Sequence, residues 1–213
     1  MSEQTLHIFL NGEMHLPEAF HAFHQPGDLI FAVDGGLHYV LRLGYLPDLL
    51  LGDLDSVEKT DLDAAEKQGV EMLRYPVQKD ETDFELALNE AVRRSARRVR
   101  IFGGLGGRLD HTLVNLSICT AQRFEALEIS FHDGGQEVFF LRKQQRIAGK
   151  AGDLLSLIPW GTPVTGVTTT NLAYPLDHET LFAEGSRGIS NILLSDSASV
   201  TYESGRLLCI HQS

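Results

Sequence analysis

The pattern of apolar residues changes once along this chain of 213 residues, near Asp133 to Gln136. Before that point, short apolar runs rich in β-forming residues alternate with longer segments of helical period, which is typical of an α/β layer. After it, short alternating segments are separated by Gly, Pro and Asp, without helical periodicity. We therefore predict two domains: an α/β domain over residues 1–134 and an antiparallel β-sandwich over residues 135–213.

The first part contains six apolar runs that we expect to be strands, at residues 6–10, 28–33, 48–52, 70–75, 98–102 and 127–132. Because continuous apolar strands suit a parallel sheet covered on both faces, we predict a mostly parallel sheet with helices on both sides. The clearest helix is expected over residues 81–96, where Phe84, Leu88 and Ala91 lie on one apolar stripe. Strands of the second part are expected at residues 138–148, 153–160, 164–172, 192–203 and 206–212.

The formal net charge of −11 argues against a nucleic-acid or anionic-membrane surface, because both need an excess of Lys and Arg. A basic run at residues 93–100 lies at a predicted helix end, where we expect a solvated face. Cys119 and Cys209 stand in apolar contexts without CxxC spacing, so we expect buried thiols. No stretch approaches the length of a membrane span, and we expect a cytoplasmic protein.

Four polar segments each follow a predicted strand: Asp34-Gly35-Gly36, residues 52–56 (GDLDS), residues 79–83 (KDETD) and residues 103–111 (GGLGGRLDH). In an open parallel sheet, ligands bind at the carboxyl ends of the strands. We therefore expect these four segments to meet at one edge of the sheet.

Two acidic pairs occur in these segments. Asp53 and Asp55 are two residues apart at a strand end and should point to the same side, where they repel each other unless a cation joins them. Oxygen ligands suit Mg²⁺. Asp80 and Asp83 are three residues apart at a helix start and share one face. The alternatives stay open: Asp55 could cap the following helix, and Asp80 could be an N-cap with Asp83 completing a capping box.

The glycine-rich segment lies between a strand and a helix. Its backbone N–H groups could approach phosphates, and Arg108 adds a planar donor for phosphate oxygens. The spacing matches neither the dinucleotide GxGxxG nor a Walker loop. For Asp110 and His111, helix capping and first-turn charge remain an alternative.

Five segments together resemble the thiamine pyrophosphokinase family, both in their residues and in their order along the chain. They are residues 34–56, 79–88, 103–116, 168–176 and 186–191. The resemblance spans nearly the whole chain. It implies a catalytic α/β nucleotide-binding domain and a β-sandwich that binds thiamine. It also implies ATP and thiamine as substrates, Mg²⁺ as cofactor, and a homodimer with active sites at the subunit interface.

The resemblance also assigns residues by position. The family's acidic positions around magnesium and the nucleotide phosphates correspond to Asp53, Asp55, Asp80 and Asp83, and Asp110 joins them in the catalytic set. The remaining nucleotide-binding positions correspond to Asp34, Lys79, Thr82, Gly107, Arg108 and His111.

The thiamine-binding positions correspond to Tyr174, Ser190 and Asn191. Without the resemblance, Tyr174 would be expected as a core aromatic of the sandwich and the Ser-Asn pair as a turn. Ile192 departs from the family, since an acidic residue is common after this pair in its bacterial members.

The implied reaction is attack of the thiamine hydroxyl on ATP, giving thiamine diphosphate and AMP, with Asp80 or Asp110 accepting the proton. Three alternatives stay open. LLLGDLDSV also fits a haloacid-dehalogenase-like phosphatase that is phosphorylated on Asp53. A pterin pyrophosphokinase would share the fold, and a thiamine or nucleotide sensor would keep the pocket without turnover.

Overall fold

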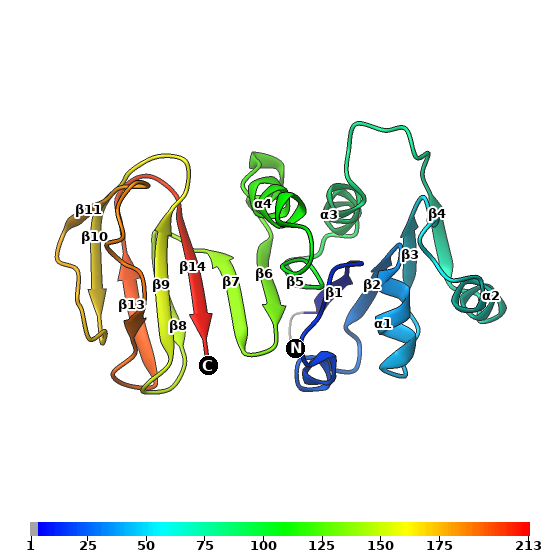
Figure 1. The fold of residues 1–213 in the computed structure, drawn as a ribbon, viewed down its shortest axis with the longest axis horizontal. Helices are drawn as coiled ribbons and strands as arrows, with labels where there is room; N and C mark the ends of the chain where they lie inside the picture. The colour runs from blue at the N-terminus through cyan, green and yellow to red at the C-terminus, as the bar shows by residue number, and fades with distance from the viewer. Residues whose placement is uncertain (1–3) are drawn as a thin grey trace. The chain divides into compact units, whose positions relative to one another are not determined.

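In the computed structural model, which describes residues 4–213, the chain forms two compact units that divide between Gly134 and Gly135 (Figure 1). Within the described part, no helix has the length and apolar character of a membrane span.

The N-terminal unit contains six strands in the order β6-β5-β1-β2-β3-β4, and every neighbouring pair is parallel. This confirms the predicted parallel sheet, and each predicted strand matches an observed one to within about one residue at each end. The strands are β1 (Thr5–Phe9), β2 (Leu29–Val33), β3 (Leu49–Gly52), β4 (Glu71–Arg74), β5 (Arg98–Phe102) and β6 (Glu128–Asp133).

Helices cover both faces of this sheet, as predicted. Figure 1 shows α3 and α4 on one side and α1 on the other. The alternation within β2 explains why: Ile30 and Ala32 join a core with Leu37 of α1, whereas Phe31 points to the other face, beneath the Arg94 guanidinium. The helices are α1 (Gly36–Arg42), α2 (Lys59–Lys67), α3 (Asp83–Arg93) and α4 (Leu109–Ile118), with short 3-10 helices η1 (Pro17–Ala22) and η2 (Gln122–Phe124).

The helix expected over residues 81–96 is shorter at both ends. Thr82 is its N-cap and accepts a hydrogen bond from the Glu85 N–H at 3.2 Å. Asp80 as an N-cap was therefore wrong. At the other end, Ser95 adopts a left-handed conformation with φ of 59°, which ends the helix.

The basic run is solvated at Arg93 and Arg97, as expected, but several of its side chains also bind other residues. Arg93 and Arg94 both bind the buried carboxylate of Glu90, at 2.6 and 2.5 Å. Arg100 donates a hydrogen bond to the Phe23 carbonyl at 3.2 Å. The signal was present in the sequence, because Glu90 stands three and four residues before Arg93 and Arg94, on the same helix face.

The C-terminal unit is a sandwich of antiparallel strands, as predicted. One layer has the order β12-β9-β14-β7 and the other β11-β10-β13-β8. Leu157 and Cys209 from the first layer pack with Val167 and Val200 from the second in one buried core. The strands are β7 (Gln136–Phe140), β8 (Gln144–Ala148), β9 (Leu154–Pro159), β10 (Val164–Thr170), β11 (Glu179–Leu181), β12 (Asn191–Ile192), β13 (Ser197–Thr201) and β14 (Leu207–Gln212).

Three details of this unit differ from prediction. The segment 138–148 is two strands, β7 and β8, because a short connection joins the two layers there. Only the second half of 192–203 is a full strand, and β11 was not predicted at all.

The two free thiols were both expected to be buried. Cys209 of the C-terminal unit is buried, whereas Cys119 of the N-terminal unit is only half-buried, although burial raises the pKa of both.

Candidate active site

Asp34 follows β2 and is held by the loop that follows β3. Its N–H donates to the Leu51 carbonyl at 3.0 Å, and its Oδ1 accepts from the Leu54 N–H at 3.0 Å. Gly52 makes room for this carboxylate, because a Cβ at that position would lie 1.8 Å from Asp34 Oδ1. Gly52 also has a φ of 137°, which side chains rarely allow.

The Asp53–Asp55 turn presents two carboxyl groups together. Asp53 is half-buried, and its Oδ1 accepts a hydrogen bond from the Asp55 N–H at 3.1 Å. The hydrogen bond to Asp53 and the Asp53 negative charge raise the pKa of the exposed Asp55 carboxyl. The alternative that Asp55 caps the next helix was wrong, since α2 begins at Lys59 after Glu58.

Asp83 is the first residue of α3. Its Oδ1 lies 3.0 Å from Lys79 Nζ, which also donates to the Pro76 carbonyl at 3.1 Å. Both side chains are largely buried, with 22% of Asp83 and 12% of Lys79 exposed. Asp80, by contrast, is exposed in the connection between β4 and α3.

Aspartates in these different loops affect one another's pKa values. Burial raises the pKa of Asp34 to about 7, and the negative charges of Asp83 and Asp53 act in the same direction. The Asp83 charge also raises the pKa of Asp55. The aspartates at the ends of β2 and β3 and at the start of α3 thus lie within electrostatic reach of one another, as the sheet topology predicts.

The oxygen-only donor set fits a hard divalent cation. Repulsion among the carboxylates is the unfavourable charge that such a cation offsets. Asp83 Oδ1 is buried and accepts no hydrogen bond of good geometry, although the Lys79 ammonium is close. The site is not preassembled at bonding distance: within residues 4–213, no three of the predicted ligands Asp53, Asp55, Asp80 and Asp83 have oxygens within 4.8 Å of one another.

Two side chains of α4 form hydrogen bonds with backbone carbonyls of the glycine-rich segment. Thr112 donates through its hydroxyl to the Leu105 carbonyl at 3.1 Å, and Asn115 through its amide to the Gly104 carbonyl at 3.2 Å. Around Gly107 the surroundings are open, since a Cβ there would meet no atom within 4 Å. The backbone next to the first turn of α4 is therefore accessible to a ligand.

Arg108 and Asp110 form a separate exposed ion pair. Arg108 is the N-cap residue of α4, and its guanidinium lies 2.6 Å from Asp110 Oδ2. The hydrogen bond from Arg108 lowers the pKa of Asp110. His111 is exposed in the same first turn. The ion pair fits a phosphate-binding role for Arg108. It fits equally well the alternative that Asp110 only supplies negative charge in the first turn of α4.

Asn11 is a candidate that the sequence interpretation missed. Its amide donates to Ser56 Oγ at 3.3 Å, and the same hydroxyl accepts from the Gly35 N–H at 3.2 Å. A Cβ on Gly35 would lie 2.1 Å from Asn11 Oδ1. Hydrogen bonds and a close contact therefore connect the residues that follow β1, β2 and β3. The signal was present, because Asn11-Gly12 follows an apolar strand as the other four polar segments do.

The three predicted thiamine-binding residues come together in the C-terminal unit. The Asn191 side chain is buried, accepts from the Tyr174 N–H at 2.9 Å and donates to the Tyr174 carbonyl at 2.7 Å. The Tyr174 side chain is 60% exposed, so the core-aromatic alternative was wrong. Ser190 is exposed and has a φ of 54°, with its N–H bound to Ser156 Oγ at 3.0 Å. The Ile192 N–H donates to Asn191 Oδ1 at 3.0 Å.

Comparison with known protein families gives two matches, one in each unit. Residues 20–131 match the sequence model of the thiamin pyrophosphokinase catalytic domain. Residues 141–207 match that of the thiamin pyrophosphokinase vitamin B1 binding domain.

Curated relatives agree with these matches. Thiamine pyrophosphokinase of Bacillus subtilis is 26% identical over 212 residues, covering 99% of each chain. Thiamine pyrophosphokinase 1 of Oryza sativa subsp. japonica is 27% identical over 175 residues, covering 77% of this chain and 66% of that protein.

Solved structures share the fold. A crystal structure of thiamin pyrophosphokinase from Geobacillus thermodenitrificans superposes with a TM-score of 0.83, at 27% identity over 99% of this chain and 98% of the other. The enzyme from Bacillus subtilis gives a TM-score of 0.89 at 24% identity, covering 99% of both chains. The phosphatase, pterin kinase and sensor alternatives are not favoured by any of these similarities. The first family match covers more than half of the sequence, and the chain belongs to the thiamin pyrophosphokinase family.

Proposed function

We propose that this chain transfers the pyrophosphoryl group of ATP to the hydroxyl of thiamine, giving thiamine diphosphate and AMP. The observation that carries the proposal is the electrostatic coupling of Asp34, Asp53 and Asp83 from three loops of the sheet edge, in a chain of this family. A group of partly buried carboxylates is costly to maintain without a cation to offset their repulsion. Its place at the strand ends is where an α/β sheet binds nucleotides.

Magnesium is the proposed cofactor, held by carboxylates of Asp53, Asp55, Asp80 and Asp83. When bound, the ion offsets charge on the ATP phosphates as the β-phosphorus is attacked. The charges of Asp83 and Asp53 act on Asp34, whose carboxylate accepts a hydrogen bond from the Leu54 N–H. Lys79 is a further cation at the site, held by its ion pair with Asp83, and is proposed to contact the nucleotide phosphates. Thr82 supports them by capping α3.

The glycine-rich loop and the first turn of α4 are proposed to bind phosphate. Gly107 leaves the backbone open, and Arg108 offers a planar fork of donors to phosphate oxygens. To do so, Arg108 exchanges its exposed partner Asp110 for the nucleotide, which costs little because an exposed ion pair contributes little stability. His111 lies in the same turn and completes the proposed nucleotide contacts.

Either Asp80 or Asp110 is proposed to accept the proton of the thiamine hydroxyl. The pairing with Arg108 lowers the pKa of Asp110, which makes that carboxylate the weaker base while the pair persists. No nucleophilic side chain is needed, because positioning and electrostatic stabilisation account for most of the acceleration in phosphoryl transfer.

The exposed Tyr174 ring is proposed to contact the thiamine rings. Asn191 acts through Tyr174, since its two hydrogen bonds hold the Tyr174 backbone and leave the aromatic face free. Ser190, with its exposed hydroxyl, is the proposed polar contact of this site. Aromatic faces suit the cationic thiazolium of thiamine.

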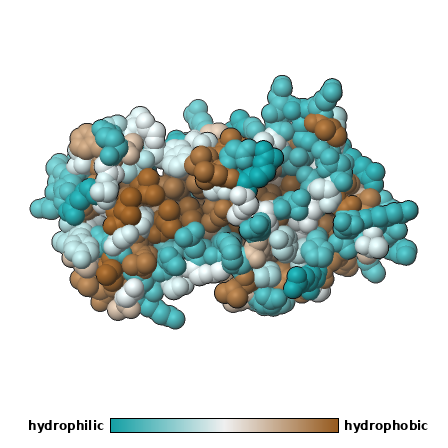
Figure 2. Space-filling view, in the orientation of Figure 1, coloured by the Kyte–Doolittle hydropathy of each residue, from teal (hydrophilic) through white to brown (hydrophobic). Residues whose placement is uncertain are grey.

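A homodimer with active sites at the subunit interface is also proposed. Exposed apolar side chains are consistent with association: Figure 2 shows apolar surface over α4, where Leu109 is 70% and Leu113 48% exposed. These two residues are four apart and share one helix face. The cytoplasmic location expected from the sequence stays a prediction.

An assay of AMP release with ATP, Mg²⁺ and thiamine tests the proposed function. We expect AMP and thiamine diphosphate in equal amounts, and no AMP when thiamine is omitted. Binding of both ligands without AMP would favour the sensor. Turnover of hydroxymethylpterin in place of thiamine would favour the pterin kinase, and trapping of a phosphoryl group on Asp53 would favour the phosphatase.

A further inference from the structure

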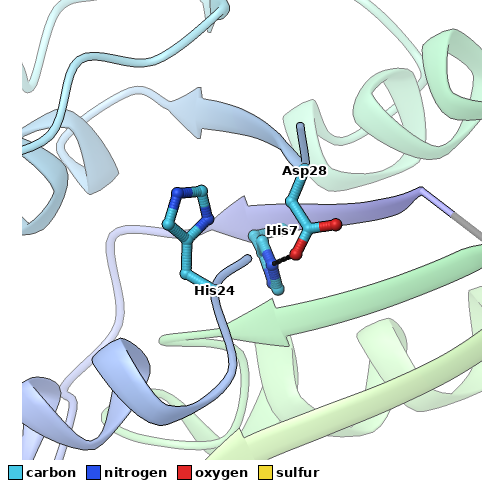
Figure 3. Close-up of side chains that lie close together, drawn as sticks. All are labelled: His7, His24 and Asp28. Carbon is cyan, nitrogen blue, oxygen red and sulfur yellow. Dashed lines mark hydrogen bonds and ion pairs between the residues drawn. The ribbon is translucent and has the colours of Figure 1, made fainter. Parts of the chain in front are cut away.

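A second polar cluster lies in the N-terminal unit, away from the carboxylates described above. It consists of His7 in the middle of β1, His24 in the connection after η1, and Asp28 immediately before β2 (Figure 3). Asp28 is at the amino end of β2, whereas Asp34 follows its carboxyl end. Each of the three side chains offers one ligand atom, and these atoms lie within 4.8 Å of one another.

Asp28 is held rigidly. Its Oδ1 accepts from the Thr5 N–H at 2.9 Å, and its Oδ2 accepts from the Gln25 N–H at 3.0 Å and lies 3.1 Å from His7 Nε2. Burial raises the pKa of Asp28, but these backbone hydrogen bonds and His7 together hold it below its usual value. The cluster therefore contains a fixed, ionised carboxylate.

The two histidines have polar atoms that lack partners. His7 Nδ1 and His24 Nδ1 are both buried without a hydrogen bond, and the His7 side chain is fully buried. An unsatisfied buried polar atom costs about 1–3 kcal/mol, and native structures leave few of them. Of these two atoms, only His24 Nδ1 would gain a partner from an ion that also binds His7 through Nε2, and the two rings lie 5.7 Å apart between centres.

The donor chemistry indicates which ligand. Two imidazoles and one carboxylate are a common zinc ligand set, and three protein ligands leave one tetrahedral position for water. The fully buried His7 ring directs Nε2 toward Asp28, and a neutral imidazole nitrogen is the form that binds metals. The 3.1 Å between His7 Nε2 and Asp28 Oδ2 is close to the roughly 3.3 Å edge of a tetrahedron with bonds of about 2 Å.

Other charged groups around the cluster do not preclude a cation. The positive charge of Arg100 reaches His7 and lowers its pKa. However, the Arg100 guanidinium lies over the Phe23 ring at 5.2 Å and donates to the Phe23 carbonyl, so it is directed to another residue. The Asp28 carboxylate supplies the opposing negative charge at the cluster itself.

We propose that His7, His24 and Asp28 form a binding site for a zinc-type divalent ion, with water as the fourth ligand. The site is separate from the proposed magnesium site in both position and chemistry. Imidazole ligands favour zinc and neighbouring transition metals, whereas the carboxylate oxygens around Asp53 favour magnesium. Each site should therefore keep its own ion when both metals are present.

Cobalt titration of the full chain tests the proposal, because Co²⁺ replaces Zn²⁺ and gives visible absorption bands in tetrahedral sites. The protein is first stripped with a chelator and then kept in excess Mg²⁺. We expect one equivalent of Co²⁺ with tetrahedral bands, displaced by Zn²⁺. His24→Gln should weaken this binding at least about tenfold. His21→Gln, which alters an exposed histidine of η1 bound to Tyr45, should leave it unchanged.

Two results would overturn the proposal. One is the absence of tetrahedral Co²⁺ bands in the unaltered chain, and the other is equal Co²⁺ affinity in His24→Gln. X-ray absorption of the zinc-loaded unaltered chain gives a readout that needs no variant. A shell with two imidazoles supports the site, and an oxygen-only shell refutes it. Neither readout depends on kinase activity, so failure here is distinguishable from failure of the proposed function.

Discussion

Asp53 combines a half-buried position with a backbone hydrogen bond from Asp55 that fixes its carboxylate. We expect Asp53→Asn, which keeps the size and removes the charge, to lower turnover about a hundredfold through weaker metal binding. Steady-state kinetics across a range of Mg²⁺ concentrations check this, with Asp63→Asn on the exposed part of α2 as the control. Near-normal turnover in the Asp53 variant would contradict the assigned role.

Asp34 makes stability depend on pH. Burial raises its pKa to about 7 from an ordinary 3.8, so the native state disfavours the charged form. The stabilising contribution of the protonated group is complete below about pH 4 and is lost as the pH rises to about 7. Asn cannot ionise and still accepts the Leu54 N–H.

We therefore expect Asp34→Asn to unfold at higher urea than the parent at pH 8 without metal, and at similar urea near pH 4. Unfolding curves at the two pH values, with chelator present, provide the measurement. Equal urea midpoints at both pH values would show that the Asp34 charge is not buried. Activity should fall in the same variant, because the site loses one negative charge.

Tyr174 offers a matched comparison within the C-terminal unit. An aromatic contact contributes about 0.5–1.5 kcal/mol beyond its buried area, so Tyr174→Ala should raise the KM for thiamine up to about tenfold. Tyr174→Phe should keep the KM near the parent value. Phe182→Ala removes another aromatic side chain that is 50% exposed and should have no effect. Equal KM changes in Tyr174→Ala and Phe182→Ala would argue against ring contact.

At the residue scale, the sequence located the acidic loops because strand ends determine where polar residues gather. It could not show that the half-buried Asp34 carboxylate accepts a hydrogen bond from the Leu54 N–H, since this depends on the left-handed conformations of both residues. It also could not decide between Asp80 and Thr82 as the cap of α3. Both residue types cap helices, and only the backbone path selects one.

At the scale of elements, the β3 end depends on one glycine. Gly52→Ala would place a Cβ 1.8 Å from Asp34 Oδ1 at a φ of 137°. We expect loss of activity and clear destabilisation in thermal unfolding. Gly69→Ala after α2 is the control: its φ is also positive, at 72°, but a Cβ there meets nothing within 4 Å. It should cost only about 1–2 kcal/mol of backbone strain. Equal destabilisation of the two variants would show that the contact with Asp34 is unimportant.

Strands of four or more residues with regularly placed buried side chains were predictable. Burial is continuous in β3 and alternates in β9, and in both the predicted and observed bounds agree to within one residue. In the sandwich, β11 has three residues and one buried side chain, which leaves almost no pattern to detect. Short edge strands are specified by their neighbours, here by pairing with β10.

At the scale of the whole molecule, the change of pattern near residue 134 predicted the two architectures, because parallel and antiparallel sheets need different connections. A mixing experiment tests the proposed association of two chains. Asp53→Asn and Tyr174→Ala alter different units, and each is expected to be poorly active at low thiamine. If each active site combines residues of two subunits, a mixed dimer contains one intact site and one doubly altered site.

Refolding the two variants together should then restore activity to about a quarter of the parent, because half of the dimers are mixed and half of their sites are intact. Sedimentation of the unaltered chain should give twice the mass of one chain. If both residues of a site come from the same chain, mixing restores no activity, because every site then keeps one of the two substitutions. That outcome would leave the kinase proposal intact and would refute the shared site.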